Sequence, residues 1–230
     1  MKNIRNFLLA ILLIASFSTV SAQDKIGLSV HLGGILPMGQ FTETPAYIYF
    51  NENFHGTGDK CGAIFGASLG LRYNYTFAGT TIEETGVGIF VSADAFWNYI
   101  NKTMRNQYDS VKCTKPMYIN VPIMLGVSWT SDFVNSPVNV WAEAGIGCDL
   151  FLKTTEGWKA RTTSYEMNPE FACEGGVGIL INRMFSVGVH YYWLGKQDIK
   201  RKDVDYANGG FGVPPTVAIH MMAFKVGFHF

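Results

Sequence analysis

Phe224-Lys225-Val226-Gly227-Phe228-His229-Phe230 closes this chain of 230 residues, and every second side chain in the stretch is large and apolar. Such alternation has the period of a β-strand, in which successive side chains point to opposite faces of the sheet. One face would carry three phenylalanines and a valine, and the other a lysine, a glycine and a histidine. The stretch therefore predicts a terminal strand that divides an apolar environment from a polar one.

The same alternation recurs along the rest of the chain. In each segment Val, Ile, Leu and aromatic residues occupy one face, while the other is mainly Gly and Ser; the chain holds 25 glycines. No long window shows the period of an amphipathic helix. We expect eight strands, at about residues 25–36, 62–76, 86–99, 117–129, 138–152, 170–181, 184–194 and 217–230.

The segments between these strands alternate in length. Four are long, at about residues 39–60, 100–116, 153–169 and 195–216. Three are short, at about residues 77–85, 130–137 and Asn182-Arg183. Bacterial outer-membrane barrels have an even number of strands, long extracellular loops and short periplasmic turns. The sequence thus predicts an all-β fold, an eight-stranded antiparallel up-and-down transmembrane β-barrel.

The composition of the polar face distinguishes a membrane barrel from a soluble one. A soluble barrel would need an outer face rich in Lys, Glu, Thr and Gln, whereas here that face is mostly Gly and Ser. Small residues suit the narrow interior that eight strands enclose, so we expect the apolar face to contact lipid. Aromatic girdles would flank it. The periplasmic girdle would comprise Tyr73, Tyr75, Trp129, Phe228 and Phe230, and the outer girdle Trp97, Tyr99, Tyr191 and Trp193.

The N-terminus has the features of a secretory signal. Basic residues precede an apolar stretch from Phe7 to Ile14, and Val20-Ser21-Ala22 provides a small-x-small cleavage site. The apolar stretch is too short to span a bilayer. We expect cleavage of residues 1–22, which leaves residues 23–230 as one β-barrel domain that is integral to the outer membrane.

Charge and motifs argue against several functions. The 18 basic and 18 acidic residues balance and form no basic stripe, so we expect no nucleic-acid partner. No G-x-S-x-G elbow and no phosphate-binding glycine loop occurs. His220 and Ser164 would lie on the extracellular side, but their context does not mark a nucleophile and its base. We therefore expect neither an enzyme nor a cofactor.

Several ionisable residues share the Gly- and Ser-rich face that would line the lumen. We expect a packed network of ion pairs that largely fills the barrel, because buried charges must be paired or hydrogen-bonded. A charged pore lining is the alternative. The six residues are Arg72, Asp94, Glu143, Asp149, Glu174 and Lys225.

Three histidines, His31, His190 and His229, share the same inward face. A metal site would need them at one level with an open coordination position. No Cys/His ligand spacing accompanies them, so we expect hydrogen bonding inside the barrel and no metal.

The four cysteines would lie in an oxidising compartment, where disulfides are permitted. Cys61 and Cys113 flank extracellular loops, and we expect them to form a disulfide, although sequence alone does not fix the connectivity. Cys148 and Cys173 share an outward face on neighbouring strands, where they could lie side by side.

The first long loop is unusually aromatic. An exposed aromatic loop predicts a recognition surface for a protein or glycan; a loop that folds back to cap the barrel mouth is the alternative. Its aromatic residues are Phe41, Tyr47, Tyr49, Phe50, Phe54 and His55.

The chain resembles the outer-membrane β-barrel domain family of porin-family and PorT-like proteins over essentially the whole mature sequence. The resemblance is carried by Tyr118-Ile119-Asn120-Val121-Pro122-Ile123-Met124-Leu125-Gly126, by residues 139–147, by Gly175-Gly176-Val177-Gly178-Ile179 and by Val226 to Phe230. It implies a small barrel of Gram-negative bacteria but no activity. Pro122 would face the lumen and cause a bulge or bend, because proline removes a ladder donor.

These observations predict a monomeric outer-membrane barrel with a mostly filled lumen and a structural or recognition role through its extracellular loops. Its partners would be outer-membrane lipid, an extracellular protein or glycan, and the barrel-assembly machinery, which would read Phe228 and Phe230 during biogenesis. A narrow porin-like channel for small solutes or ions is one alternative. An accessory component of a secretion or envelope-assembly complex, suggested by the PorT-like resemblance, is another.

Overall fold

Eight long strands form the body of the molecule. A computed structural model describes residues 26–44, 49–50, 55–56, 60–77, 85–110, 112–131, 136–154, 156–158, 161–163, 165–200, 202 and 215–230. The signal peptide expected at residues 1–22 lies outside these residues, so its cleavage stays a prediction.

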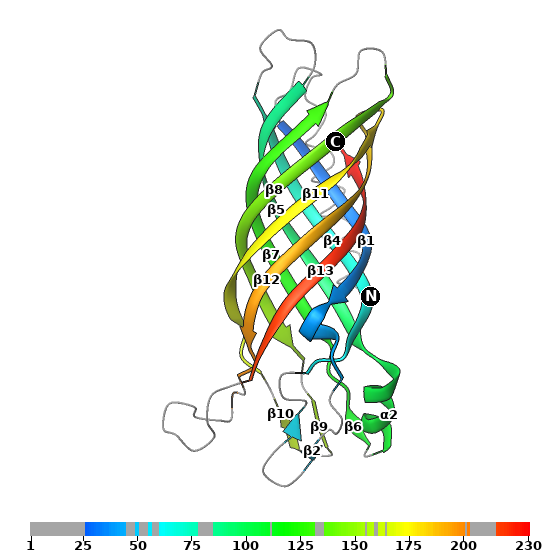
Figure 1. The fold of residues 1–230 in the computed structure, drawn as a ribbon, viewed down its shortest axis with the longest axis vertical. Helices are drawn as coiled ribbons and strands as arrows, with labels where there is room; N and C mark the ends of the chain where they lie inside the picture. Colours follow the sequence, from blue (N-terminus) through cyan, green and yellow to red (C-terminus); the bar gives the residue numbers. More distant parts are fainter. Residues whose placement is uncertain are drawn as a thin grey trace, which may run out of the picture.

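The long strands close into a single antiparallel barrel (Figure 1). Pairing between the first and the last strand completes the ring, in the order β1-β13-β12-β11-β8-β7-β5-β4. The strands are β1 (Ile26–Met38), β4 (Ala63–Thr76), β5 (Thr85–Ile100), β7 (Tyr118–Ser131), β8 (Val138–Lys153), β11 (Asn168–Ile181), β12 (Phe185–Asp198) and β13 (Thr216–His229). The predicted fold class is confirmed, and the predicted strand ends differ from these by at most a few residues.

The barrel has a turn end, where the short connections lie, and a loop end, where the long ones lie. At the turn end Asn182, Arg183 and Met184 join β11 to β12, and the first two have φ angles of 51° and 58° in the left-handed region. The Met184 N–H donates to the Ile181 carbonyl at 3.0 Å. Positive φ angles at both central residues are a feature of type I′ turns, which suit the twist of antiparallel strands.

The loop end carries short elements that alternation along the chain did not reveal (Figure 1). The elements are η1 (Gly39–Thr42), β2 (Tyr49–Phe50), β3 (His55–Gly56), α2 (Lys102–Ser110), β6 (Cys113–Thr114), β9 (Glu156–Trp158) and β10 (Arg161–Thr163). β6, β9 and β10 form a small sheet that ties two long connections together. α2 occupies a segment for which we expected only a loop. Within the described ranges, no helix is long and apolar enough to cross a membrane.

The outward face of the barrel is a belt of apolar side chains. Leu32 on β1 and Val177 on β11 are 60% and 59% exposed. Outward Val, Ile, Leu and Phe residues on the other strands are also exposed. A water-soluble surface rarely exposes so large a contiguous apolar area, whereas a bilayer requires it. Tyr75 lies beside the start of β1 and Trp97 beside the start of β7, so aromatic residues flank the belt toward both ends.

Of the bulge or bend that we expected at Pro122, the bulge does not occur. It faces the lumen, and β7 keeps one register against β5 on both sides of it, from the Ala93–Ile123 pair to the Phe96–Asn120 pair. The missing N–H interrupts the ladder without shifting it, because the neighbouring pairs hold the strands in place.

The register shifts occur near the loop end instead. One lies between Ala63 and Gly66 on β4, and the other between Trp193 and Lys196 on β12. Gly195, inside the second shift, has a φ angle of 77°, a conformation that glycine adopts without steric cost. Neither shift is visible in the alternation of the sequence.

The apolar belt makes a direct prediction about stability. Val177→Arg places a charge on the middle of the lipid-facing surface and should lower the free energy of unfolding by about 2–4 kcal/mol. Urea unfolding of the chain refolded into lipid vesicles measures the change. Thr103→Arg, on the exposed face of α2, is the matched control and should change stability by less than about 0.5 kcal/mol. Equal effects of the two substitutions would mean that Val177 does not face lipid.

Candidate functional site

The six ionisable residues expected on the inner face all point into the lumen and are buried. Five of them lie together near the middle of the barrel, and we name them the charge layer. The charge layer comprises Arg72, Asp94, Glu143, Glu174 and Lys225. Asp149 stands apart, close to the loop end of β8.

Lys225 on β13 makes the first ion pair of the charge layer. Its Nζ donates to Oδ1 of Asp94 at 2.7 Å and to the hydroxyl of Tyr192 at 2.7 Å. The Tyr192 hydroxyl in turn donates to Oδ2 of Asp94 at 3.2 Å, and Nζ lies 5.6 Å from the centroid of the Phe96 ring. A buried ammonium is stable only with such partners, so these contacts fix Lys225 as a structural cation.

Arg72 on β4 makes the second ion pair. Its Nη1 donates to Oε2 of Glu143, and its Nε donates to Oδ1 of Asn74 at 2.8 Å. The guanidinium carbon lies 3.8 Å from the centroid of the Phe90 ring, a cation–π contact. Because β5 and β7 separate β4 from β8 in the barrel, the Arg72–Glu143 pair links non-adjacent parts of the wall through the lumen.

Asp149 belongs to a separate polar group. Its carboxylate accepts bonds from Nδ2 of Asn120 at 2.6 Å and from Nε2 of Gln197 at 3.2 Å. The backbone N–H of Val121 also donates to it. Asp149 lies directly opposite Pro122 in the β7–β8 ladder. Its carboxylate therefore accepts these hydrogen bonds close to the point where proline leaves the ladder without a donor.

Gly176 shows why the inner face is rich in glycine. It lies between Glu143 on β8 and His190 on β12 in the hydrogen-bonded ladder. A Cβ at this position would stand 2.6 Å from Nδ1 of His190, closer than side-chain atoms tolerate. Large polar residues therefore fit in the lumen only because a neighbouring strand carries no side chain at the same level.

The loop end of the lumen is filled by a group of buried rings that we name the aromatic plug. Its members are Phe41, Phe96, Tyr118, Phe151 and Tyr192. The Phe41 ring lies 5.4 Å from that of Tyr118 and 6.2 Å from that of Phe151, and the rings of Phe96 and Tyr192 are 5.0 Å apart. These three pairs pack edge to face, and the rings of Tyr118 and Phe151 stack at 6.1 Å, so buried aromatic rings occupy the lumen at this end.

Phe41 enters the plug from η1, which folds back into the barrel mouth. Gln40 fixes η1 to β13, since its Oε1 accepts from the Ala218 N–H at 3.0 Å and its Nε2 donates to the Thr216 carbonyl at 3.4 Å. We expected the aromatic loop either to form a recognition surface or to cap the barrel mouth. Phe41 caps the mouth. The loop's remaining aromatic side chains, Tyr47, Tyr49, Phe50, Phe54 and His55, lie outside the described set.

The turn end of the lumen is hollow. A cavity of about 430 Å³ opens there, and Arg72, Glu143, His190 and Lys225 of the barrel middle contribute to its lining. Toward the turn end its wall is polar and aromatic, with Trp141 among the lining residues. The expectation of a mostly filled lumen therefore fits the loop end of the barrel but not the turn end, where this cavity lies.

The three inward histidines do not share one level. The rings of His31 and His229 are 5.8 Å apart, and Nε2 of His229 lies 2.8 Å from the hydroxyl of Ser186. His190 lies with Trp141 instead, with ring centroids 5.3 Å apart. The interior polar contacts expected for these residues are present for His229, with Ser186, and for His190, with Glu143.

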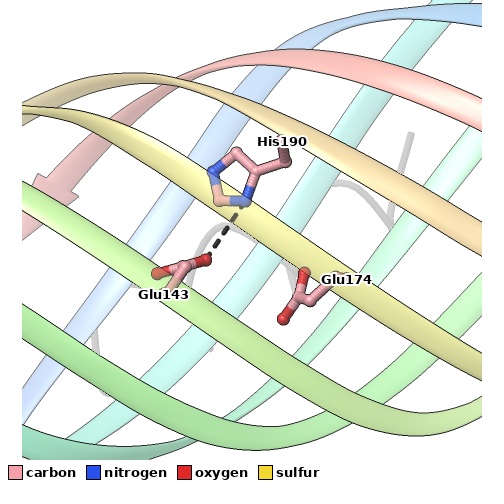
Figure 2. Close-up of side chains that lie close together, drawn as sticks. All are labelled: Glu143, Glu174 and His190. Atoms are coloured by element: carbon pink, nitrogen blue, oxygen red, sulfur yellow. Dashed lines mark ion pairs between the residues drawn. The ribbon is translucent and has the colours of Figure 1, made fainter.

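His190 groups with two carboxylates (Figure 2). Its Nδ1 lies 3.1 Å from Oε1 of Glu143, and one ligand atom each of Glu143, Glu174 and His190 lies within 4.8 Å of the others. These are residue types that hold metal ions. Sequence reasoning missed the group, because the three residues come from β8, β11 and β12 and only the strand register brings them together.

The large inward side chains were also missed. Phe90 and Phe96 on β5 and Tyr192 on β12 fill the lumen beside the charges. Their signal was present in the sequence, since all three have the inward parity of their strands.

The cysteines lie in two places. Cys61 and Cys113 are both buried at the loop end, and their disulfide stays a prediction. Cys148 lies opposite Phe171 in the β8–β11 ladder, and Cys173 lies opposite Ile146, so the two outward cysteines are diagonal neighbours and not directly paired. His220 also faces outward, with its Nδ1 2.6 Å from the Tyr191 hydroxyl, while Ser164 lies outside the described residues.

No protein-family model matches this chain. No curated protein matches it either. Among solved structures, Neisserial surface protein A is similar with 10% sequence identity over 90% of this chain and 96% of that chain, at a TM-score of 0.48. The outer membrane enzyme PagL is similar with 14% identity over 88% and 98% of the two chains, at a TM-score of 0.48. The outer membrane protein OprG from Pseudomonas aeruginosa is similar with 14% identity over 89% of this chain and 95% of that chain, at a TM-score of 0.43.

At these identities and TM-scores, none of the three likenesses bears on what this chain does. The porin-family and PorT-like resemblance stays a prediction.

The Arg72–Glu143 pair generates a prediction about coupling. Arg72→Met should lower the free energy of unfolding by about 3–5 kcal/mol, because it leaves a buried carboxylate without its cation. Adding Glu143→Gln should recover part of the loss. A double-mutant cycle from urea unfolding in vesicles measures the coupling.

An exposed pair at the loop end is the control. Nζ of Lys115 lies 2.7 Å from Oδ1 of Asp109 in an exposed setting, and Lys115→Met should cost less than about 1 kcal/mol. Strictly additive effects of the Arg72 and Glu143 substitutions would show that the two side chains do not act as a pair.

Proposed function

We propose that the protein is an integral outer-membrane barrel that does not conduct, and that it serves as an anchor for a contact surface formed at its loop end. The observation that carries this proposal is the aromatic plug. Five buried rings occupy the lumen at the loop end, and a pore for ions or solutes needs a continuous polar path. The apolar belt on the outside supports insertion in a bilayer.

The loop end supports the recognition half of the proposal. α2 buries Met104 and Tyr108 and presents Lys102, Arg105 and Asp109 to solvent. Short strands of two long connections form a sheet beside it. An ordered surface costs less entropy to bind than loose loops, and its mixed charges suit a polar partner such as a protein or glycan.

A narrow channel is the second candidate function, and the hollow turn end favours it. The cavity exposes Arg72 and Lys225 to small solutes from that side. Transport through the barrel would require the aromatic plug to move. The role of an accessory component in a secretion or envelope-assembly complex rests on the PorT-like resemblance alone.

Conductance separates the two candidates. The refolded mature chain, residues 23–230, should insert into planar bilayers and give no steady single-channel steps, because the plug closes the loop end. The double variant Phe41→Ala/Phe151→Ala removes two rings of the plug and should give measurable single-channel steps. Steps from this variant would also show that the refolded barrel inserts into the bilayer. Reproducible conductance of the unchanged chain, with a selectivity altered by Lys225→Met, would establish the channel instead.

Surface labelling tests the membrane orientation. A cysteine in place of Thr103 on α2 should react with a membrane-impermeant maleimide on intact cells, because the loop end faces the outside in this proposal. A cysteine in place of Asn182 at the turn end should react only after the outer membrane is opened. The unsubstituted chain gives the background from its native cysteines. The opposite labelling pattern would invert the orientation and remove the extracellular contact surface.

A further inference from the structure

Three buried polar atoms lie close together inside the barrel: Oε1 of Glu143, Oε1 of Glu174 and Nδ1 of His190. Their side chains come from the adjacent strands β8, β11 and β12 and gather in one part of the lumen (Figure 2). Nδ1 of His190 and Oε1 of Glu143 form an ion pair at 3.1 Å, whereas Oε1 of Glu174 has no hydrogen-bond partner among the described residues. Buried polar atoms almost always have a partner, so the Glu174 oxygen beside this pair calls for one.

The spacing of these atoms fits a small metal ion. Zinc bonds of about 2.0–2.2 Å place two tetrahedral ligand atoms roughly 3.3–3.6 Å apart. Oε1 of Glu143 and Nδ1 of His190 are 3.1 Å apart. One ligand atom of each of the three residues lies within 4.8 Å of the others, a spread within which the three could hold one metal ion.

Neighbouring residues hold two of the ligands in place. Arg72 binds Oε2 of Glu143 and leaves Oε1 for the ion, while Gly176 leaves space for the His190 ring. The imidazole tautomer with its proton on Nε2 offers the Nδ1 lone pair. Partners of this kind orient the ligands of metal sites and tune their affinity.

The charges of the layer also favour a cation beside Glu174. Arg72 is paired with Glu143, and Lys225 with Asp94. Glu174 is only 6% exposed, and within the described residues no ion pair reaches it. A buried carboxylate without a cation is costly, and a divalent ion between Glu174 and Glu143 offsets both that cost and their mutual repulsion.

An ion can reach this position from the cavity. Glu143 and His190 line the cavity that opens at the turn end. The same route supplies a water molecule as the fourth ligand. The mixed nitrogen and oxygen set favours zinc or a neighbouring transition metal, since magnesium and calcium prefer oxygen ligands alone.

We propose that Glu143, Glu174 and His190 bind one divalent transition-metal ion, represented by Zn²⁺, inside the barrel. The ion links β8, β11 and β12 and is reached from the turn end.

Zinc binding to the refolded mature chain in detergent tests this proposal, after removal of bound metal with a chelator. Competition with a chromophoric zinc chelator should show one site per chain, and millimolar Mg²⁺ should not displace the ion. Glu174→Gln and His190→Gln should each weaken binding at least about 10-fold. Asp149→Asn, a buried lumenal carboxylate outside the group, should leave the affinity unchanged.

Two controls separate this site from other zinc ligands in the chain. His31→Asn/His229→Asn should retain the site, and so should the chain with its cysteines alkylated. X-ray absorption of the zinc-loaded, unsubstituted chain should show only nitrogen and oxygen at about 2.0–2.2 Å; this measurement does not depend on the folding of a variant. Sulfur ligands, binding that survives both Glu174→Gln and His190→Gln, or no stoichiometric binding would overturn the proposal.

Discussion

The narrowness of an eight-stranded lumen is the constraint on which the rest of this structure depends. Such a barrel has room for a few large side chains only if the neighbouring strands carry none at the same level. The position of Gly176 between Glu143 and His190 shows this relation directly. Charged groups brought into so small a space lose their water, so each needs a partner from another strand. Pairs such as Arg72–Glu143 therefore connect non-adjacent parts of the wall.

The same constraint divides the barrel along its axis. Large rings on β5, β7, β8 and β12, with Phe41 from η1, occupy the loop end, whereas a cavity with a mainly polar lining lies at the turn end. The charge layer lies between these parts. Lys225 contacts Tyr192 of the plug and also lines the cavity. A lumen that is closed at one end and polar at the other is consistent with an anchor, and it gives small cations access to buried ligands from one side only.

Much of the fold was predictable, because alternation reports the environment on each side of a strand. The eight strands, their inward and outward faces and the tight turn at Asn182-Arg183 follow from local sequence. The groups inside the barrel do not, since Glu143, Glu174 and His190 come together only through a register that local sequence leaves open. The insertion of Phe41, the ordered elements at the loop end and the shift at Gly195 depend on tertiary packing. Pro122 does not shift the register, because the residue pairs on both sides of it keep β7 aligned with β5.

The closed lumen is the central claim, and side-specific thiol modification tests it most directly. A cysteine at Ser128, which lines the cavity, would be probed in oriented vesicles with a small charged thiosulfonate reagent. The account predicts rapid reaction from the turn end and none from the loop end. A cysteine at Met221, buried on the inner face of β13, should be protected from both sides. Reaction of the Ser128 position from the loop end would show an open path through the barrel and would contradict the account.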